Sequence, residues 1–539
     1  MKDGLKTRYF EDIIQRCYLD NPHKVLLTMR PSTTMAAERE AAQAKELADK
    51  KAAMSAEDIQ RVIEQTAQLK EEQQRPETPE ALATIPVLQR SDIRKEADPV
   101  VLEEREAAGC KVLFSDINTS GIGYVQMFFD AHGVAQEDLP YAYLLADLLG
   151  AVDTAQRGYA DLANQENLST GGIDYHLISY VKNGTPDDWL PLFRVKAKAL
   201  MAKLPRMFEL AAEILTESRF TDRKRMRELL LQCRAGAEMD IQRTPHAMMF
   251  VRLASYLTDC GQFEDVGALQ YYWFVRDITD HFDEKFDAVA KKLADLLTLL
   301  FRRGGLTVSF TGKEEDYEVF AKEFEAFAKK LPEGKAAAVE WHWQPENRKE
   351  GLSTASQVQY VGKAANFIKL GYEFRGSMRV LENLLRYDYF WTKIRVQGGA
   401  YGAMTRFSRA GTLLFASYRD PNLTETMDVF NGTADYAANY EASEREMNKA
   451  VIGTMSGIDA PLTPQMKGNQ AVACYFQNVK DADRQKVRDE ILGVTQQDIR
   501  DLAPVIRDAM ALDTFCVIGN EAKLKEHEAV FRKIVPVME

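Results

Sequence analysis

Apolar and polar residues alternate with a period of two in several short stretches, which predicts β-strands. Two such strands follow Cys110, in KVLFSDIN and IGYVQMFFDA, and are joined through Thr119-Ser120-Gly121. The short apolar run KVLLTM at 24–29, ended by Pro31, predicts a buried strand. Further strands are predicted at 171–181, 305–312, 357–361, 367–374 and 514–519, with a hairpin of 400–407 and 412–418.

Other stretches carry the three-and-four spacing of helices. Val380, Leu384, Tyr387, Trp391 and Ile394 recur at that spacing, so we expect a helix over 378–394 with one apolar face. Helices are also predicted over 139–149, over 189–300 and after Asp420, whose side chain is expected to be the N-cap. The polar stretch 332–356 is expected to be an irregular connection.

The composition changes between Met35 and Gln74, where Ala, Glu, Lys and Gln dominate. These are strong helix formers. Ser55 followed by Asp58 is typical of a helix N-cap and divides the stretch into two helices, so we expect a helical hairpin. Pro76, Pro79 and Pro86 then indicate an extended linker that runs to about Asp98.

One pattern occurs three times: an apolar strand followed by a polar helix, in HKVLLTM, GLTVSFTG and DTFCVIGN. The second and third copies each close a unit of strands and helices, which indicates a duplicated domain. The first copy lies near Met1 with no such unit before it. We therefore expect the chain to begin inside the tail of a preceding domain. Chance similarity of short strand-helix pairs is the alternative.

Composition narrows the function classes. The chain has 539 residues, which suggests several domains, and 45% are hydrophobic, as in ordinary globular proteins. A net charge of −12 argues against nucleic-acid binding, because phosphate neutralisation needs a basic face. No apolar run reaches the length of a membrane span, and the N-terminus lacks the apolar core of a secretory signal. The six cysteines are scattered and form no CxxC pair, which suits a reducing compartment.

Motifs for metal and phosphate binding are missing from the sequence. Neither HExxH nor HxxEH occurs among the seven histidines, so we expect no catalytic metal held wholly by this chain. GGAYG at 398–402 fits neither GxGxxG nor a phosphate loop, and it precedes a strand where such loops precede a helix.

The densest local signal is WTKIRVQGGAYG at 391–402. Gly398 and Gly399 end a helix and allow close approach of another backbone, with Arg395 before them and Tyr401 after. Arg395 can donate to a peptide carbonyl, and Tyr401 can donate to a developing oxyanion. The structural alternative is a helix C-cap and turn, with Arg395 neutralising the helix dipole and Tyr401 in the core.

At this point the sequence resembles a known family. TKIRVQGGAYGAMTRF followed by LLFASYRDPNL resembles the C-terminal half of the presequence protease branch of the pitrilysin/insulinase family of zinc peptidases. The resemblance covers nearly the whole chain. It implies an α+β fold in which two homologous domains of mixed and antiparallel sheet pack with helices, after a helical hairpin linker.

The resemblance also implies the division of the chain. Residues 1–34 would be the tail of a preceding family domain, and 35–98 the helical hairpin and linker. Residues 99–335 would form the third, non-catalytic family domain, and 336–539 the fourth. The zinc motif of the family belongs to the first domain, which has no counterpart here. The third-domain helix in the corresponding place, Tyr141 to Leu149, carries aliphatic and aromatic residues.

By the resemblance, Arg395 and Tyr401 are the family's substrate-facing pair, placed to be catalytic. Arg395 would hold the peptide backbone and Tyr401 would stabilise the tetrahedral intermediate, with Gly398 and Gly399 allowing close approach of the substrate. Zinc is implied in the complete enzyme, with its ligands in the N-terminal half and none on this chain. The implied partners are that catalytic half and unstructured peptides, without nucleic acid or membrane.

The leading hypothesis is therefore the non-zinc-binding half of a metalloendopeptidase that degrades unstructured peptides in an enclosed chamber, inactive by itself. The alternative is a peptide-binding or scaffold subunit with no catalytic activity, although such a subunit would have no chemical need for the Arg–Tyr pair. The expected compartment is the bacterial cytoplasm, with an organellar matrix as the other possibility.

Overall fold

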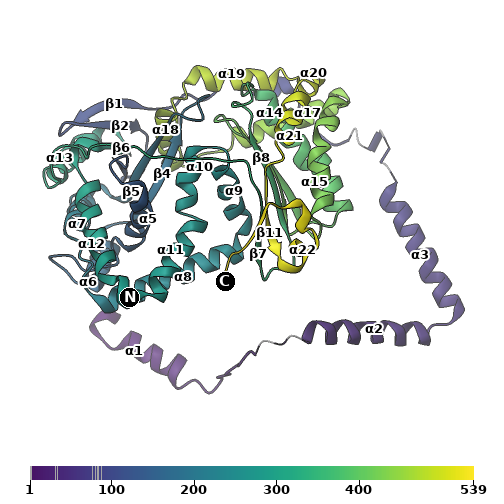
Figure 1. Cartoon of the computed structure of the whole chain (residues 1–539), viewed down its shortest axis with the longest axis horizontal. Coiled ribbons are helices and arrows are strands. Elements are labelled where there is room, and N and C mark those ends of the chain that lie inside the picture. The colour runs from purple at the N-terminus through teal and green to yellow at the C-terminus, as the bar shows by residue number, and fades with distance from the viewer. Residues whose placement is uncertain are drawn as a thin grey trace. The chain divides into compact units, whose positions relative to one another are not determined.

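The computed structural model describes residues 3–30, 32, 34–75, 77–78, 80–81, 84–86 and 88–538. The chain divides into two compact units, Met1–Val87 and Leu88–Glu539 (Figure 1). Within the described residues, no helix is both long and apolar enough to cross a bilayer.

The first unit is helical. Its elements are α1 (Tyr9–Ile14), α2 (Met35–Ala53) and α3 (Ala56–Gln74), with short helical turns at Gly4–Lys6 and Gln15–Leu19. Ser55 caps α3 by accepting a hydrogen bond from the Asp58 amide, and Asp58 accepts one from the Ser55 amide in return, which confirms the predicted capping box. The buried strand predicted at 24–29 is wrong. These residues form no strand, and Leu26 is 94% exposed.

The second unit contains two six-stranded sheets. The first sheet has β1 (Glu103–Ala107), β2 (Cys110–Asp116), β3 (Ile122–Asp130), β4 (Ile173–Val181), β5 (Trp189–Leu200) and β6 (Leu306–Gly312). Its helices are α5 (Leu139–Leu148), α6 (Tyr159–Ser169), α7 (Leu204–Glu217), α8 (Arg223–Arg243), α9 (Pro245–Ser255), α10 (Asp259–Val266), α11 (Leu269–Asp280), α12 (Phe282–Leu300) and α13 (Glu314–Ala328).

The second sheet has β7 (Lys349–Thr354), β8 (Tyr360–Asn366), β9 (Gly402–Phe407), β10 (Thr412–Tyr418), β11 (Phe515–Asn520) and β12 (Lys533–Pro536). Its helices are α14 (Gly376–Leu384), α15 (Thr424–Asn431), α16 (Thr433–Ala438), α17 (Glu444–Ile458), α18 (Pro464–Phe476), α19 (Asp481–Leu492), α20 (Gln496–Arg500), α21 (Ala503–Ala511) and α22 (Glu521–Glu526). Two π-helical stretches, η7 (Leu385–Tyr389) and η8 (Trp391–Gln397), continue α14 toward β9.

The two sheets repeat one topology. The order β2-β6-β3-β5-β4 in the first corresponds strand by strand to β7-β11-β8-β10-β9 in the second. In both, the first pair is parallel and the other neighbours are antiparallel. Only the added edge strand differs, since β1 is antiparallel to β2 whereas β12 is parallel to β7. The predicted duplicated α+β fold is confirmed.

Three predicted elements are wrong in detail. The helical stretch predicted from residue 189 begins with strand β5, where Val195, Ala197 and Ala199 point into the core and Lys196 and Lys198 alternate with them. The irregular connection 332–356 contains β7, and residues 367–374 form a turn and an extended segment in place of a strand. β7 escaped prediction because it buries a charged residue, Glu350.

Each sheet is covered on one face by a helix from the other half of the unit (Figure 1). Met249 and Leu253 of α9 pack in one buried cluster with β8, β10 and β11. Reciprocally, Val472 and Phe476 of α18 pack against β2, β3 and β5, with the rings of Phe476 and Phe128 centred 5.0 Å apart. Each fully buried side chain of this kind contributes about 1.5–3 kcal/mol.

A buried ionic cluster joins the two halves. Arg252 of α9 donates through Nε and Nη2 to both carboxylate oxygens of Glu350, at 2.7 and 3.0 Å, and through Nη1 to Asp265 at 2.6 Å. Tyr256 donates its hydroxyl to Glu350 at 2.5 Å. Burial alone would raise the pKa of Glu350, but the hydrogen bonds and charge of Arg252 hold it below its usual value.

Candidate functional site

The candidate site begins where the π-helical stretch η8 ends. Phe390 and Ile394 are buried and anchor the stretch to the core, whereas Trp391 and Val396 are exposed. Helical turns with i→i+5 bonds are rare and occur often at functional sites. The predicted helix over 378–394 is therefore present, but its second part is π-helical and runs three residues further.

Two glycines close the helix. The amides of Gly398 and Gly399 donate to the carbonyls of Lys393 and Arg395, at 3.1 and 3.0 Å. Gly399 has φ of +80°, which side-chain-bearing residues adopt only with strain. A Cβ on Gly398 would lie 2.6 Å from the Ile394 carbonyl oxygen. Asn422 fixes the turn from outside by donating to the Gly398 carbonyl at 2.6 Å.

The turn brings Arg395 and Tyr401 together, as the sequence predicted from their spacing. Arg395 donates from Nη1 to the backbone carbonyl of Tyr401 at 2.5 Å. Its guanidinium lies 4.3 Å from the centre of the Trp391 ring and 5.3 Å from that of Tyr401. Cation–π contacts of this kind hold a guanidinium in place while leaving its other donors available.

Tyr401 does not lie in the core, so that part of the structural alternative is wrong. The residue is 63% exposed, and its hydroxyl makes no hydrogen bond within the described part of the chain. The backbone is nevertheless fixed, because the Tyr401 amide donates to the Tyr418 carbonyl at 3.1 Å. The result is a free phenol on an ordered backbone beside a held guanidinium.

An aromatic floor of Tyr418, Tyr360 and His246 lies under this pair, and sequence reasoning missed it. The Tyr401 ring meets the Tyr418 ring edge-on at 5.8 Å, and Tyr418 meets the His246 ring at 4.9 Å. Burial lowers the pKa of His246, which favours the neutral imidazole. His246 comes from α9 of the first half, so no local signal in the sequence could have placed it here.

Asp420 has a structural role, but not as the predicted N-cap. The helix that follows begins at Thr424 after Leu423, without a side-chain cap. Asp420 is buried and accepts hydrogen bonds from the Asn422 amide at 2.9 Å and the Thr426 hydroxyl at 2.7 Å. Burial raises its pKa. These bonds shape the loop that carries Asn422 to the glycine turn.

The residues present do not fit a catalytic zinc. Among those that the structure describes, no group of three or more His, Cys, Asp or Glu side chains is placed to hold a metal ion. Helix α5, in the place where the resemblance implies the zinc helix of a catalytic domain, carries neither His nor Glu. No metal step is therefore assigned to this chain.

Comparison with known proteins agrees with the geometry. A family of domains associated with peptidases of family M16, subfamily C, matches residues 29–278, and the "PreP C-terminal domain" matches residues 349–518. The chain is 32% identical over 515 residues to presequence protease 1, chloroplastic/mitochondrial, of Arabidopsis thaliana, covering 93% of this chain and 48% of that protein. This chain is a C-terminal, presequence-protease-like M16 half.

Other relatives of this M16 half have the same relation in length. Protein HypA of Clostridium perfringens is 34% identical over 539 residues, covering 100% of this chain and 55% of that protein. The mitochondrial presequence protease of Schizosaccharomyces pombe is 23% identical, covering 92% of this chain and 50% of that protein. The chain thus spans about half the length of the curated relatives it matches.

Solved structures share the fold of this M16 half. A peptidase M16 inactive domain from Pseudomonas fluorescens superposes with a TM-score of 0.56 at 15% identity, covering 78% of this chain and 98% of that chain. A protease from Helicobacter pylori gives a TM-score of 0.55 at 14% identity, covering 77% and 98%.

Proposed function

We propose that this chain is the non-zinc-binding half of a metalloendopeptidase that degrades unstructured peptides in an enclosed chamber. In this proposal Arg395 holds the backbone of the bound peptide. Tyr401 donates its hydroxyl to the oxyanion that develops when the peptide carbonyl is attacked. The zinc, in the catalytic half, supplies the activated water.

The observation that carries the proposal is the free hydroxyl of Tyr401 on a fixed backbone. A donor contributes to catalysis when it is oriented before the reaction, because no reorganisation is then needed as charge develops. The capped helix end, the Asn422 bond and the Arg395 bond to its carbonyl orient Tyr401 in this way. A purely structural tyrosine would gain nothing from leaving its hydroxyl unpaired and exposed.

The exposed apolar residues of the first unit support a partner. Val25, Leu26, Leu27 and Met29 are all more than three-quarters exposed. The equivalent strands in the repeat, β6 and β11, each lie between two other strands of a sheet. We propose that 24–29 inserts in the same manner into a sheet of the catalytic half, which would hide this apolar run from water. Peptide degradation of this kind is compatible with either the cytoplasm or an organellar matrix.

Replacing Tyr401 by Phe tests the proposal. The chain is combined with the zinc-binding half, and cleavage of a long unstructured peptide is measured. Loss of one oxyanion donor is expected to lower kcat by about 10²-fold while KM changes little. Tyr159→Phe is the matched control, because Tyr159 is also exposed and also lies against an arginine, with Arg225 3.9 Å from its ring centre. Unchanged turnover in Tyr401→Phe would refute the role and favour the scaffold alternative.

A further inference from the structure

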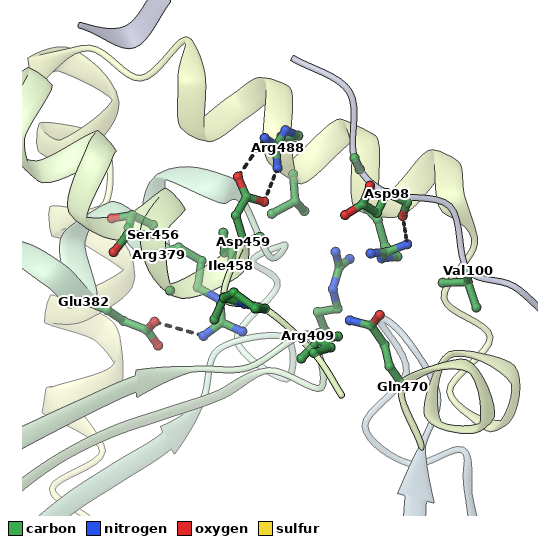
Figure 2. A pocket seen from close by; sticks show the side chains of 18 of the residues that line it. Asp98, Val100, Arg379, Glu382, Arg409, Ser456, Ile458, Asp459, Gln470 and Arg488 are labelled. Carbon is green, nitrogen blue, oxygen red and sulfur yellow. Dashed lines mark hydrogen bonds and ion pairs between the residues drawn. The ribbon is translucent and has the colours of Figure 1, made fainter. Parts of the chain in front are cut away.

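A cavity of about 1020 Å³ lies away from the Arg395–Tyr401 turn, between the segment 97–101 and helices α14, α17, α18 and α19 (Figure 2). The turn between β9 and β10 contributes Arg409 to its wall. The cavity belongs wholly to the second unit. Its volume is that of a site for a small molecule, since such sites measure about 300–1,000 Å³.

The wall carries more positive than negative charge. Its cations are Arg379, Arg386, Arg409, Lys467, Arg484 and Arg488, and its carboxylates are Asp98, Glu382 and Asp459. This excess contrasts with the acidic chain as a whole, whose net charge is −12. A concave wall of one sign focuses the field and attracts ligands of the opposite sign.

All three carboxylates are already neutralised. Asp459 accepts a two-pronged ion pair from Arg488, at 2.6 and 2.9 Å. Glu382 pairs with Arg379 at 2.9 Å, and Asp98 pairs with Arg94, outside the wall, at 2.7 Å. Figure 2 shows the first two pairs as dashed lines. None of these carboxylates balances the remaining cations.

Three cations are left without a carboxylate. Arg386, Arg409 and Lys467 make no ion pair with any residue that the structure describes. Arg409 is half-buried, lies 5.4 Å from the centre of the Phe374 ring, and donates only to the backbone carbonyl of Asp483 at 3.2 Å. Its guanidinium points into the open space near Asp98 and Gln470 (Figure 2). Burial, together with the charges of Arg379 and Arg484, lowers the pKa of Arg409 against the opposing effect of Asp483.

We propose that this cavity binds a small, multivalent, phosphate-bearing anion, held by Arg386, Arg409 and Lys467. Guanidinium groups match phosphate oxygens in two-pronged geometry, and a lysine adds a compact point charge. Neutral donors complete the wall, since Asn383, Thr454 and Gln470 line the same space. A bound anion would neutralise the cations that the chain itself leaves unbalanced. The inference does not depend on the proposed peptidase function.

Calorimetric titration of the chain with inorganic triphosphate, at low ionic strength, tests this site. The double variant Arg386→Gln/Lys467→Gln is expected to weaken binding by at least about tenfold, because each charge-assisted bond to phosphate is among the strong ones. Both residues are exposed, so the fold should persist. Arg409→Gln provides a second variant with the same expected direction. Orthophosphate should bind more weakly than triphosphate, because it can reach fewer of the three cations at once.

The matched control is Lys224→Gln/Arg507→Gln, which removes the same charge from exposed positions outside the cavity. It should leave the affinity for triphosphate within about twofold, because exposed charges beyond a Debye length are largely screened. Equal weakening by the two double variants would show only non-specific attraction and would overturn the proposal. Absence of saturable binding by the unmodified chain would overturn it as well.

Discussion

The two halves of the second unit use one topology for different ends, and the difference lies in the helix before the fourth strand of each. In the first half, α5 stops at Leu148, and six of its residues, including Leu144 and Leu145, are buried. In the second half, α14 begins in the same way but continues through η7 and η8 to Gln397. The continuation leaves Tyr387, Trp391 and Tyr401 exposed.

This comparison shows how a duplicated scaffold separates packing from recognition. α5 is apolar on most sides and serves the core. The π-helical continuation keeps Leu385, Phe390 and Ile394 in the core while it places aromatic and cationic groups outside. A stretch that is anchored along one side and open along the other can present side chains to a ligand at little cost in order.

Separating the two packed sheets would break the comparison most severely. Arg252→Ala leaves Glu350 and Asp265 buried without their cation, and the expected loss is about 3–5 kcal/mol in the free energy of unfolding. Denaturant unfolding measures it. Lys291→Ala is the control, because it removes an exposed pair with Asp295 and should cost no more than about 1 kcal/mol.

Acid sharpens the same test. The pKa of Glu350 is lowered in the folded chain, so its stabilising contribution is complete above the unfolded value of about 4.3 and is lost as the pH falls through the folded value. The difference between Arg252→Ala and the unmodified chain should therefore shrink below pH of about 4. A difference that is small at neutral pH would contradict the clamp between the halves.

A smaller change distinguishes the two helix ends. Gly150 follows α5 with φ of +78°, and Gly399 follows η8 with φ of +80°. Alanine at either position meets no atom closer than 3.6 Å, so each variant should lose only about 1–2 kcal/mol through backbone strain. Gly399→Ala should also lower peptide cleavage by the reconstituted enzyme, because it disturbs the turn that orients Tyr401. Equal activity of the two alanine variants would indicate that this turn has no functional role.

The sequence predicted the fold well where patterns are local or repeated. The recurrence of GLTVSFTG and DTFCVIGN identified β6 and β11 and hence the duplication. It failed at β5, where Ala and Lys suggested a helix although the buried positions alternate, and at β7, whose Glu350 is satisfied only by the distant Arg252 and Tyr256. At 24–29 it predicted burial, but no described residue of this chain covers the run.

The candidate site divides along the same line. Arg395, Gly398, Gly399 and Tyr401 are neighbours in the chain, so their juxtaposition could be predicted. The aromatic floor could not, because His246 reaches Tyr418 only through the packing of α9 on the second sheet. The unbalanced cations of the cavity were hidden too, since they come from three separate elements, η7, the β9–β10 turn and α18.

Cleavage of a long unstructured peptide, with zinc supplied and a chelator control, tests the central claim most directly. The purified chain alone is expected to be inactive, and addition of the zinc-binding half should produce cleavage that the chelator abolishes. Chelator-sensitive cleavage by the chain alone would contradict the account, because the reaction would then be centred on a metal site that this chain builds itself.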